Sequence, residues 1–157
     1  MKAITLRQPW ASLFVAGAKL IETRSWSTPY RGPLAVHASA KINAEEFALC
    51  YSPPFASALA NLGFNAPGDL PVGAVLGIVE IVDCLRMVAG RLTGDLAEFA
   101  INDRRAMTDN ERAFGHYAAG RFAWITSPAR TVFTKPIPAR GMLGLWELPA
   151  DVAKEIP

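Results

Sequence analysis

Short segments in which apolar and polar residues alternate recur along the chain, and this pattern predicts β-strands with one buried face. In residues 34–39 the alternation places the even-numbered residues on one face and the odd-numbered ones, including His37, on the other. Residues 72–85 form a longer apolar run with two glycines, and we expect a bent, central strand there. The prolines of residues 132–139 predict an edge strand or a kinked strand. Further strands are expected at residues 3–6, 19–26, 121–125 and 142–148.

Helix signals interrupt this strand pattern. Pro9 suits the first turn of a helix and Gly17 suits the position after the last turn, so a helix of about two and a half turns is predicted between them. Residues 43–62 are helix-like, but two adjacent prolines divide them into two pieces. Residues 92–114 are polar, charged and partly helical, and we expect them to cross the surface. Five or six short strands with two or three helices predict an α+β fold, a closed or nearly closed β-barrel with helical insertions.

The composition of the 157-residue chain, with 51% hydrophobic and 19% charged residues, predicts one compact domain over residues 1–157 with a buried core. No apolar run approaches the roughly 18 to 20 residues that span a bilayer. No apolar core of a signal peptide forms before Arg7 and Gln8. We therefore expect a cytoplasmic protein without a membrane partner, and we interpret Cys50 and Cys84 as reduced core thiols.

The net charge of +2 is distributed unevenly along the chain. Residues 1–42 contain six lysines and arginines but Glu22 as their single acidic residue, a local charge of +5 that leaves −3 for the rest. An anionic partner would explain this asymmetry, and so would a solvated basic surface. We take the basic first quarter as the first indication of where function lies.

A cluster of ionisable residues follows Gly17, in a chain that has no Gly-rich phosphate loop, no dinucleotide fingerprint and no GxSxG motif. On a regular strand Glu22 and Arg24 would share a face and Lys19 would lie opposite, so convergence of the three requires a turn or bulge near Gly17. If they converge, Lys19 can act as a general base or anion ligand, Glu22 as its positioning residue or a proton carrier, and Arg24 as a fork for phosphate. A structural ion-pair network at a barrel rim is the alternative.

Further candidate residues surround this cluster in the sequence. His37 can titrate near neutral pH, although a single histidine is often only a hydrogen-bonded structural residue. Aromatic residues beside basic ones grip single-stranded nucleic acid through stacking and phosphate contacts, but such aromatic residues also fit a core or a lid. The candidates for nucleic-acid or ligand binding are Arg7, Gln8, Trp10, Arg24, Trp26, Tyr30, Arg31, Ser39 and Lys41.

Several motifs together resemble the ASCH domain family. They are Leu6-Arg7-Gln8-Pro9-Trp10-Ala11, Gly17-x-Lys19-x-x-Glu22-x-Arg24, Tyr30-Arg31-Gly32-Pro33-Leu34-x-Val36-His37-Ala38, Leu70-Pro71-x-Gly73, Phe122-Ala123-Trp124 and Gly141-x-x-Gly144-Leu145-Trp146. The resemblance implies a PUA-like fold, a mixed β-barrel flanked by helices, with a cleft beside the first helix lined by the signature residues. It also implies RNA binding. Some bacterial members similar to this chain are ribonucleases on single-stranded RNA, and another bacterial branch hydrolyses the amide of acetylated cytidine.

The chain departs from the pattern of the amidohydrolase branch, which relies on a lysine, a threonine nucleophile and a later glutamate. The lysine corresponds to Lys19, but Glu22 occupies the threonine position, and Thr23 would point the other way on a strand. A carboxylate does not simply replace a hydroxyl nucleophile. Three positions remain open for the later glutamate, namely Glu80, Glu98 and Glu111.

Three functional hypotheses follow. The first is an RNA-binding or nucleotide-binding domain with metal-independent ribonuclease activity, in which Lys19, Glu22 and His37 are catalytic. The second is an amidohydrolase that acts on a modified nucleoside such as acetylated cytidine. The third is a non-catalytic module that binds a nucleotide and regulates another process. None of the three calls for a cofactor or a metal, and the sequence does not indicate an oligomeric state.

Overall fold

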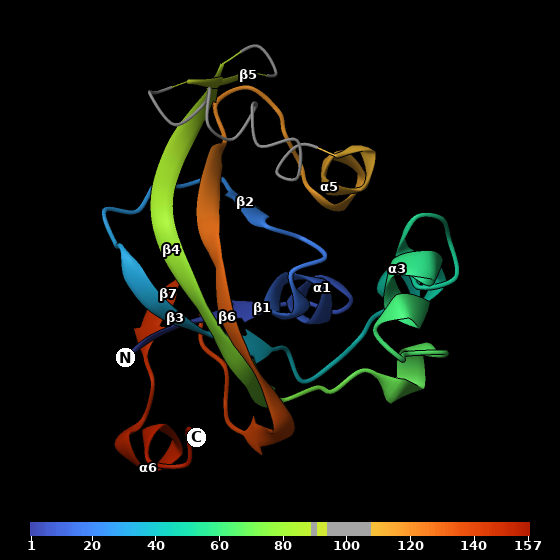
Figure 1. The fold of residues 1–157 in the computed structure, drawn as a ribbon, viewed down its shortest axis with the longest axis vertical. Coiled ribbons are helices and arrows are strands. Elements are labelled where there is room, and N and C mark those ends of the chain that lie inside the picture. The colour runs from blue at the N-terminus through green and yellow to red at the C-terminus, as the bar shows by residue number, and fades with distance from the viewer. Residues whose placement is uncertain (89–90, 94–107) are drawn as a thin grey trace.

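The computed structural model describes residues 1–88, 91–93 and 108–157 (Figure 1). The expected surface crossing at residues 92–114 lies largely outside these residues. No described helix is long and apolar enough to cross a membrane.

One mixed sheet forms the centre of the fold, and its strands follow the order β2-β6-β4-β3-β1-β7, with β5 added beside β4. The strands β1 and β3 are parallel, and the other pairs are antiparallel. The expected α+β class with a mixed sheet is therefore confirmed, and β4 is central as predicted. The ladder is open within the described part of the chain, because β2 and β7 are its two ends. The strands are β1 (Lys2–Leu6), β2 (Ile21–Arg24), β3 (Gly32–Ala38), β4 (Ala74–Val88), β5 (Arg91–Thr93), β6 (Phe122–Pro138) and β7 (Leu145–Glu147).

The two strands expected at 121–125 and 132–139 are one long strand, β6, so their separation was wrong. Its first part is flanked by β2 and β4, while its later part pairs with β4 alone. Pro136 lies where the pairing with β4 shifts register, between the pairs that Val132 and Ile137 make. This part of β6 has a partner strand on one side only, and the proline lies at the register shift. Its missing N–H therefore removes no hydrogen bond between the strands.

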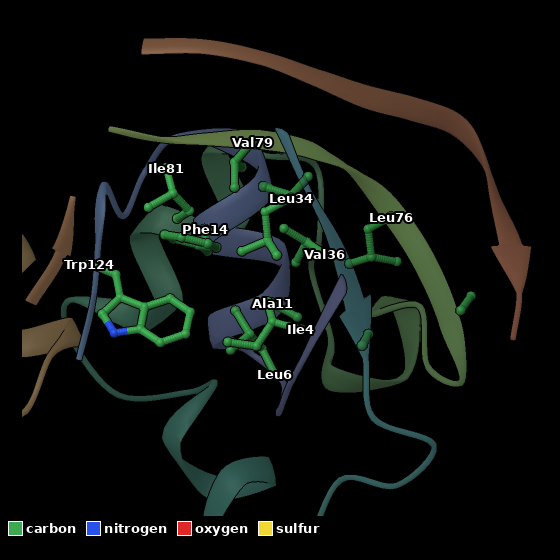
Figure 2. Packing of buried hydrophobic residues seen from close by; sticks show 13 residues of the cluster. Ile4, Leu6, Ala11, Phe14, Leu34, Val36, Leu76, Val79, Ile81 and Trp124 are labelled. Atoms are coloured by element: carbon green, nitrogen blue, oxygen red, sulfur yellow. The ribbon is translucent and has the colours of Figure 1, made fainter. Parts of the chain in front are cut away.

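Helix α1 (Trp10–Ala16) packs its apolar face into the concave side of the sheet. Phe14 is fully buried there among Leu34, Val79, Ile81 and Trp124 (Figure 2). Gln8 holds the start of the helix, because its side chain accepts the N–H of Ser12 and donates to Pro71 O and Ser12 Oγ. The start of α1 is therefore fixed by Gln8, and its apolar face is fixed by packing against the sheet.

The remaining helices are short and lie around the sheet (Figure 1). As predicted, the prolines at 53 and 54 separate two helices. Asn43 caps the first of them through a reciprocal capping box with Glu46. The helices are α2 (Ala44–Leu49), α3 (Phe55–Asn61), the 3-10 turn η1 (Pro67–Asp69), α5 (Asp109–Phe114) and α6 (Ala150–Ala153).

Gly77 lies where α1, β4 and β6 approach one another closely. A Cβ atom there would lie 2.7 Å from Val15 Cγ2 and would overlap the carbonyl oxygen of Thr131. We expect Gly77→Ala to lower the free energy of unfolding by about 3 kcal/mol, because an overpacked core must shift its backbone. The measurement is urea unfolding, with Gly68→Ala as control, since nothing lies within 4 Å of a Cβ at that position. Equal stability of the two variants would contradict this packing.

Candidate functional site

The turn required to gather the charges after α1 is present at Gly17. Its φ of 82° is left-handed, and its N–H donates to Phe14 O. Arg130 covers the turn and donates to the same carbonyl at 2.9 Å. The backbone N–H of Lys19 then donates to Leu13 O at 3.0 Å, which folds the chain back onto α1. Glycine is needed here because residues with a side chain rarely adopt this left-handed backbone conformation.

Three charges converge as a result. Lys19 Nζ lies 3.1 Å from one carboxylate oxygen of Glu22, and Arg24 Nε lies 3.1 Å from the other. Arg24 also donates to the backbone oxygen of Thr5 at 3.3 Å, which ties β2 to β1. The carboxylate of Glu22 is thus held in a fixed orientation between two cations.

The ammonium group of Lys19 is inside the protein, with only 1% of the side chain exposed. It donates to Ile21 O, pairs with Glu22 and lies 5.5 Å from the centre of the Phe14 ring. A buried charge is stable only with such partners, because water no longer solvates it. Glu22, with 11% of its side chain exposed, is the more accessible member of the pair.

Of the three glutamates left open by the sequence, Glu111 on α5 joins this cluster. Its carboxylate accepts the N–H groups of Leu20 at 2.7 Å and Ile21 at 3.2 Å, and the hydroxyl of Tyr117 at 3.0 Å. Burial raises the pKa of Glu111, while the charge of Lys19 and these hydrogen bonds oppose the rise. Glu80 is on the surface beside Ser127, and Glu98 lies outside the described residues.

A cavity of about 250 Å³ opens over this cluster. The indole of Trp10 is fixed at its side by a 2.8 Å hydrogen bond from Nε1 to Phe114 O. Thr23 also lines the cavity, although it alternates with Glu22 along the regular register of β2, as expected. The reason is that β2 is an edge strand whose free side is wrapped by residues 113–116. The cavity is lined by Trp10, Lys19, Glu22, Thr23, Ala113, Phe114, Gly115 and His116.

Sequence reasoning missed His116, which lines the cavity with an exposed side chain. Its backbone N–H donates to Thr23 Oγ1 at 3.0 Å and so fixes this segment against β2. Its only signal in the sequence was that it is one of two histidines, in a polar segment without periodicity.

A second cleft, of about 670 Å³, lies along another side of α1. Its walls are mostly apolar and include Val15, Phe64 and Phe133. None of the three converging charges lines it. The cleft expected beside the first helix is therefore represented by two hollows, and the signature residues belong to the smaller one.

His37 is not brought to Lys19 and Glu22. It lies on the face of β3 opposite the α1 core, as the alternation predicted, and lines a separate pocket together with Ser39. Ser39 donates to Lys41 O at 3.1 Å, and the Lys41 side chain is exposed. These three residues form a group of their own.

The other predicted binding residues are mostly engaged within the protein. Arg31 pairs with Asp83 at 2.6 Å and donates to two carbonyls of its own loop. Trp26 packs edge to face on Trp124, and the Tyr30 hydroxyl donates to Pro33 O. These contacts fit a structural role for this loop better than direct ligand contact.

The residues at the start of α1 divide in the same way. Arg7 is 63% exposed and pairs with Glu46 at 2.9 Å, while Gln8 is fully buried in the contacts described above. Arg7 thus stays mostly exposed while it is paired, whereas Gln8 is structural. Of this group only Trp10 reaches the cavity.

Comparisons with known proteins identify the family of this chain. The family model described as the ASCH domain matches residues 4–126. Activating signal cointegrator 1 of Homo sapiens is 40% identical over 86 residues, which are 52% of this chain and 14% of that protein. The Mus musculus protein of the same name is 38% identical over 86 residues, with the same coverage. The chain therefore spans only a small part of these curated relatives.

Solved structures agree on the fold. The crystal structure of ASCH from Zymomonas mobilis superposes with a TM-score of 0.52 at 14% identity, covering 98% of this chain and 90% of that one. A single-residue variant of that protein superposes with a TM-score of 0.53 at 15% identity, covering 98% and 94%. At this identity the likeness establishes the fold alone.

The contacts of Glu111 predict that it stabilises the segment that carries Lys19. In Glu111→Gln an amide group replaces one acceptor oxygen, so a backbone N–H of Leu20 or Ile21 loses its partner. We expect the free energy of unfolding to fall by about 1–3 kcal/mol. Urea unfolding measures this, with the exposed Glu155→Gln as matched control. If both variants unfold alike, Glu111 does not hold this segment.

The burial of His37 predicts a pH dependence of stability. Burial lowers its pKa below the ordinary 6.5, so the unfolded chain binds a proton that the folded protein does not. Stability should fall as the pH drops through 6.5 towards the lowered pKa. His37→Phe, which keeps a ring beside Trp146, should flatten the loss of unfolding free energy between pH 7 and pH 5. An unchanged pH profile would show that His37 titrates normally in the folded protein.

Proposed function

The chain belongs to the ASCH domain family, which has a PUA-like RNA-binding fold, and from this premise we propose that it binds single-stranded RNA with one nucleotide in the Lys19–Glu22 cavity. The single observation that supports this placement is the Glu22 carboxylate, held by two cations at the floor of a cavity beside Trp10. We propose that residues 1–157 form one domain and that this whole domain binds the RNA.

The size of the cavity suits one nucleotide. Sites for drug-sized ligands measure roughly 300–1,000 Å³, and 250 Å³ is below that range. One extruded base or nucleoside fits such a volume, whereas a duplex does not. Trp10 offers an aromatic surface, and Glu22 accepts a hydrogen bond from an amino or hydroxyl group of the ligand.

The backbone of the RNA would contact exposed cations outside the cavity. Arg7 and Lys41 have exposed side chains on the segments that follow β1 and β3. The residues of the basic first quarter supply these contacts, in keeping with phosphate binding by lysine and arginine.

The finer proposal is metal-independent cleavage. Glu22 takes the proton of the 2′-hydroxyl while O2′ attacks phosphorus. The P–O5′ bond breaks, and the imidazolium of His116 gives its proton to the leaving O5′. The products are a 2′,3′-cyclic phosphate and a 5′-hydroxyl end. Lys19 and Arg24 act as positioning residues for the carboxylate. His116 is the proposed proton donor, whereas His37, the catalytic candidate of the sequence analysis, lines a separate pocket.

One observation favours a second candidate, hydrolysis of an amide on a modified nucleoside such as acetylated cytidine. Thr23 lines the same cavity as Lys19, and its oxygen accepts the His116 N–H. Its hydroxyl proton therefore remains free to be removed, as a nucleophile requires. Against this stands the Lys19–Glu22 pair, which leaves no free amine to remove that proton.

The test is a fluorescence anisotropy titration of labelled single-stranded RNA between 50 and 300 mM KCl, with cleavage followed in EDTA. Affinity should fall steeply with salt if several phosphates are contacted. Glu22→Gln and His116→Asn should each lower the cleavage rate about a hundredfold while RNA still binds. Glu155→Gln, a change of an exposed glutamate, is the matched control and should keep the full cleavage rate.

Three outcomes separate the hypotheses. Salt-insensitive or undetectable RNA binding would overturn the RNA-binding proposal. Undiminished cleavage by Glu22→Gln would overturn the catalytic assignment and leave binding in place. Release of acetate from acetylated cytidine, lost in Thr23→Val, would favour the amidohydrolase.

A further inference from the structure

The imidazole of His116 lines the Lys19–Glu22 cavity without a partner of its own. Its side chain is exposed, and its ring nitrogens make no hydrogen bond or ion pair with any described residue. The contacts of His116 are made by its backbone instead. An exposed side chain without contacts moves quickly among its rotamers. Where the imidazole can act therefore depends on what holds the backbone of this residue.

The backbone of His116 is held from two sides, by Thr23 on β2 and by Arg121. Its N–H donates to Thr23 Oγ1 at 3.0 Å, and its carbonyl oxygen accepts from Arg121 Nε at 3.1 Å. The same guanidinium donates from Nη2 to the carbonyl oxygen of Thr23, also at 3.1 Å. Nε and Nη2 lie on one edge of the planar guanidinium, so Arg121 joins His116 to β2 as a rigid fork.

A second set of contacts fixes the residue before His116. A Cβ atom on Gly115 would lie 2.3 Å from Cε2 of Tyr117, so the backbone of Gly115 lies directly against this ring. Its φ of −115° is open to any residue, and glycine is required here by the lack of space. The Tyr117 hydroxyl donates to Glu111 at 3.0 Å, and Glu111 in turn accepts N–H groups at β2. His116 is therefore anchored to β2 by two separate routes.

The contacts of Arg121 exceed what covering the edge of β2 requires. Its hydrogen bond to the Thr23 carbonyl is enough to satisfy that edge. The second hydrogen bond engages a carbonyl of the segment over the edge, the one of His116. Within the part of the chain that the structure describes, Arg121 makes no ion pair with a carboxylate. Its two donors thus connect the strand to the residue that carries the imidazole.

We propose that Arg121 is a positioning residue, which holds the His116 imidazole at the cavity as the proton donor of RNA cleavage. This inference rests on the cleavage proposed above, in which the P–O5′ bond breaks while the imidazolium gives its proton to O5′. Proton transfer at this step requires the donor to lie within hydrogen-bond reach of the leaving oxygen. Without the fork the backbone of His116 is held less firmly, and the imidazole stays within this reach for less of the time.

The test compares single-stranded RNA with an analogue in which sulfur replaces O5′ at the cleaved bond. A thiolate leaves without a proton, because thiols are far more acidic than alcohols, so a defect in proton donation slows only the oxygen substrate. We expect Arg121→Gln to lower the cleavage rate of RNA about ten- to a hundredfold and to leave cleavage of the analogue unchanged. His116→Asn should show the same pattern. Glu22→Gln should be slow on both substrates, because it impairs removal of the 2′-hydroxyl proton.

Further variants separate the fork from its charge and from the fold. Arg121→Lys keeps the charge but not the planar pair of donors, so it should restore little of the rate. Gly115→Ala displaces the segment from the side of Tyr117 and should show the same dependence on the leaving atom. Combining Arg121→Gln with His116→Asn should cost no more than His116→Asn alone, because both act on one proton transfer. Arg140→Gln, the same change at an exposed arginine, is the matched control and should cleave both substrates at the full rate.

Hydrogen exchange adds a readout that does not depend on activity. The amide of His116 should exchange roughly tenfold faster in Arg121→Gln, whereas the amides of β4 should keep their rates. Equal losses on the oxygen and sulfur substrates, or an unchanged exchange rate, would overturn the positioning role and leave the proposed cleavage in place. Absence of cleavage by the unaltered protein would overturn the proposed cleavage, and with it the part of Arg121 in the reaction. The two failures are therefore distinguishable.

Discussion

The burial of the Lys19 ammonium constrains everything arranged around it. A charge removed from water needs partners on several sides, and here they come from α1 and from β2. Glu22 supplies the opposite charge, Ile21 a carbonyl, and Phe14 the face of its ring. Each partner depends on another contact, since Arg24 orients Glu22 and Glu111 fixes the backbone of Ile21. The wall of the cavity beside Lys19 is therefore built from contacts that depend on one another.

The local elements of the fold were predictable because their signals are local. Pro9 and Gly17 mark the ends of α1, the adjacent prolines divide α2 from α3, and alternation assigns the faces of β3. The length of β6 was not predictable. The prolines near its end predicted a break in the strand. In the structure the strand continues past them, because its pairing with β4 shifts register there and its other side has no partner strand.

The candidate site was predictable only in part, for a related reason. The spacing of Lys19, Glu22 and Arg24 indicated a cluster, and the condition of a turn at Gly17 was sound. His116, Glu111 and Thr23 could not be assigned, because they meet only through the way α5 and the segment after it fold over the edge of β2. The residue pattern of β2 alone does not indicate its contacts with Glu111 and His116, which lie about 90 residues later in the sequence.

That contact over β2 has a consequence for how the protein behaves among its own copies. A strand at the end of a sheet presents unpaired N–H and C=O groups that can recruit a strand from another molecule and begin aggregation. On the open side of β2, the N–H of Ile21 is taken by Glu111 and the carbonyl of Thr23 by Arg121. The side chains of Glu111 and Arg121 thus close the edge beside the cavity, and the protein keeps a cavity-lining strand without offering it as a template for intermolecular pairing.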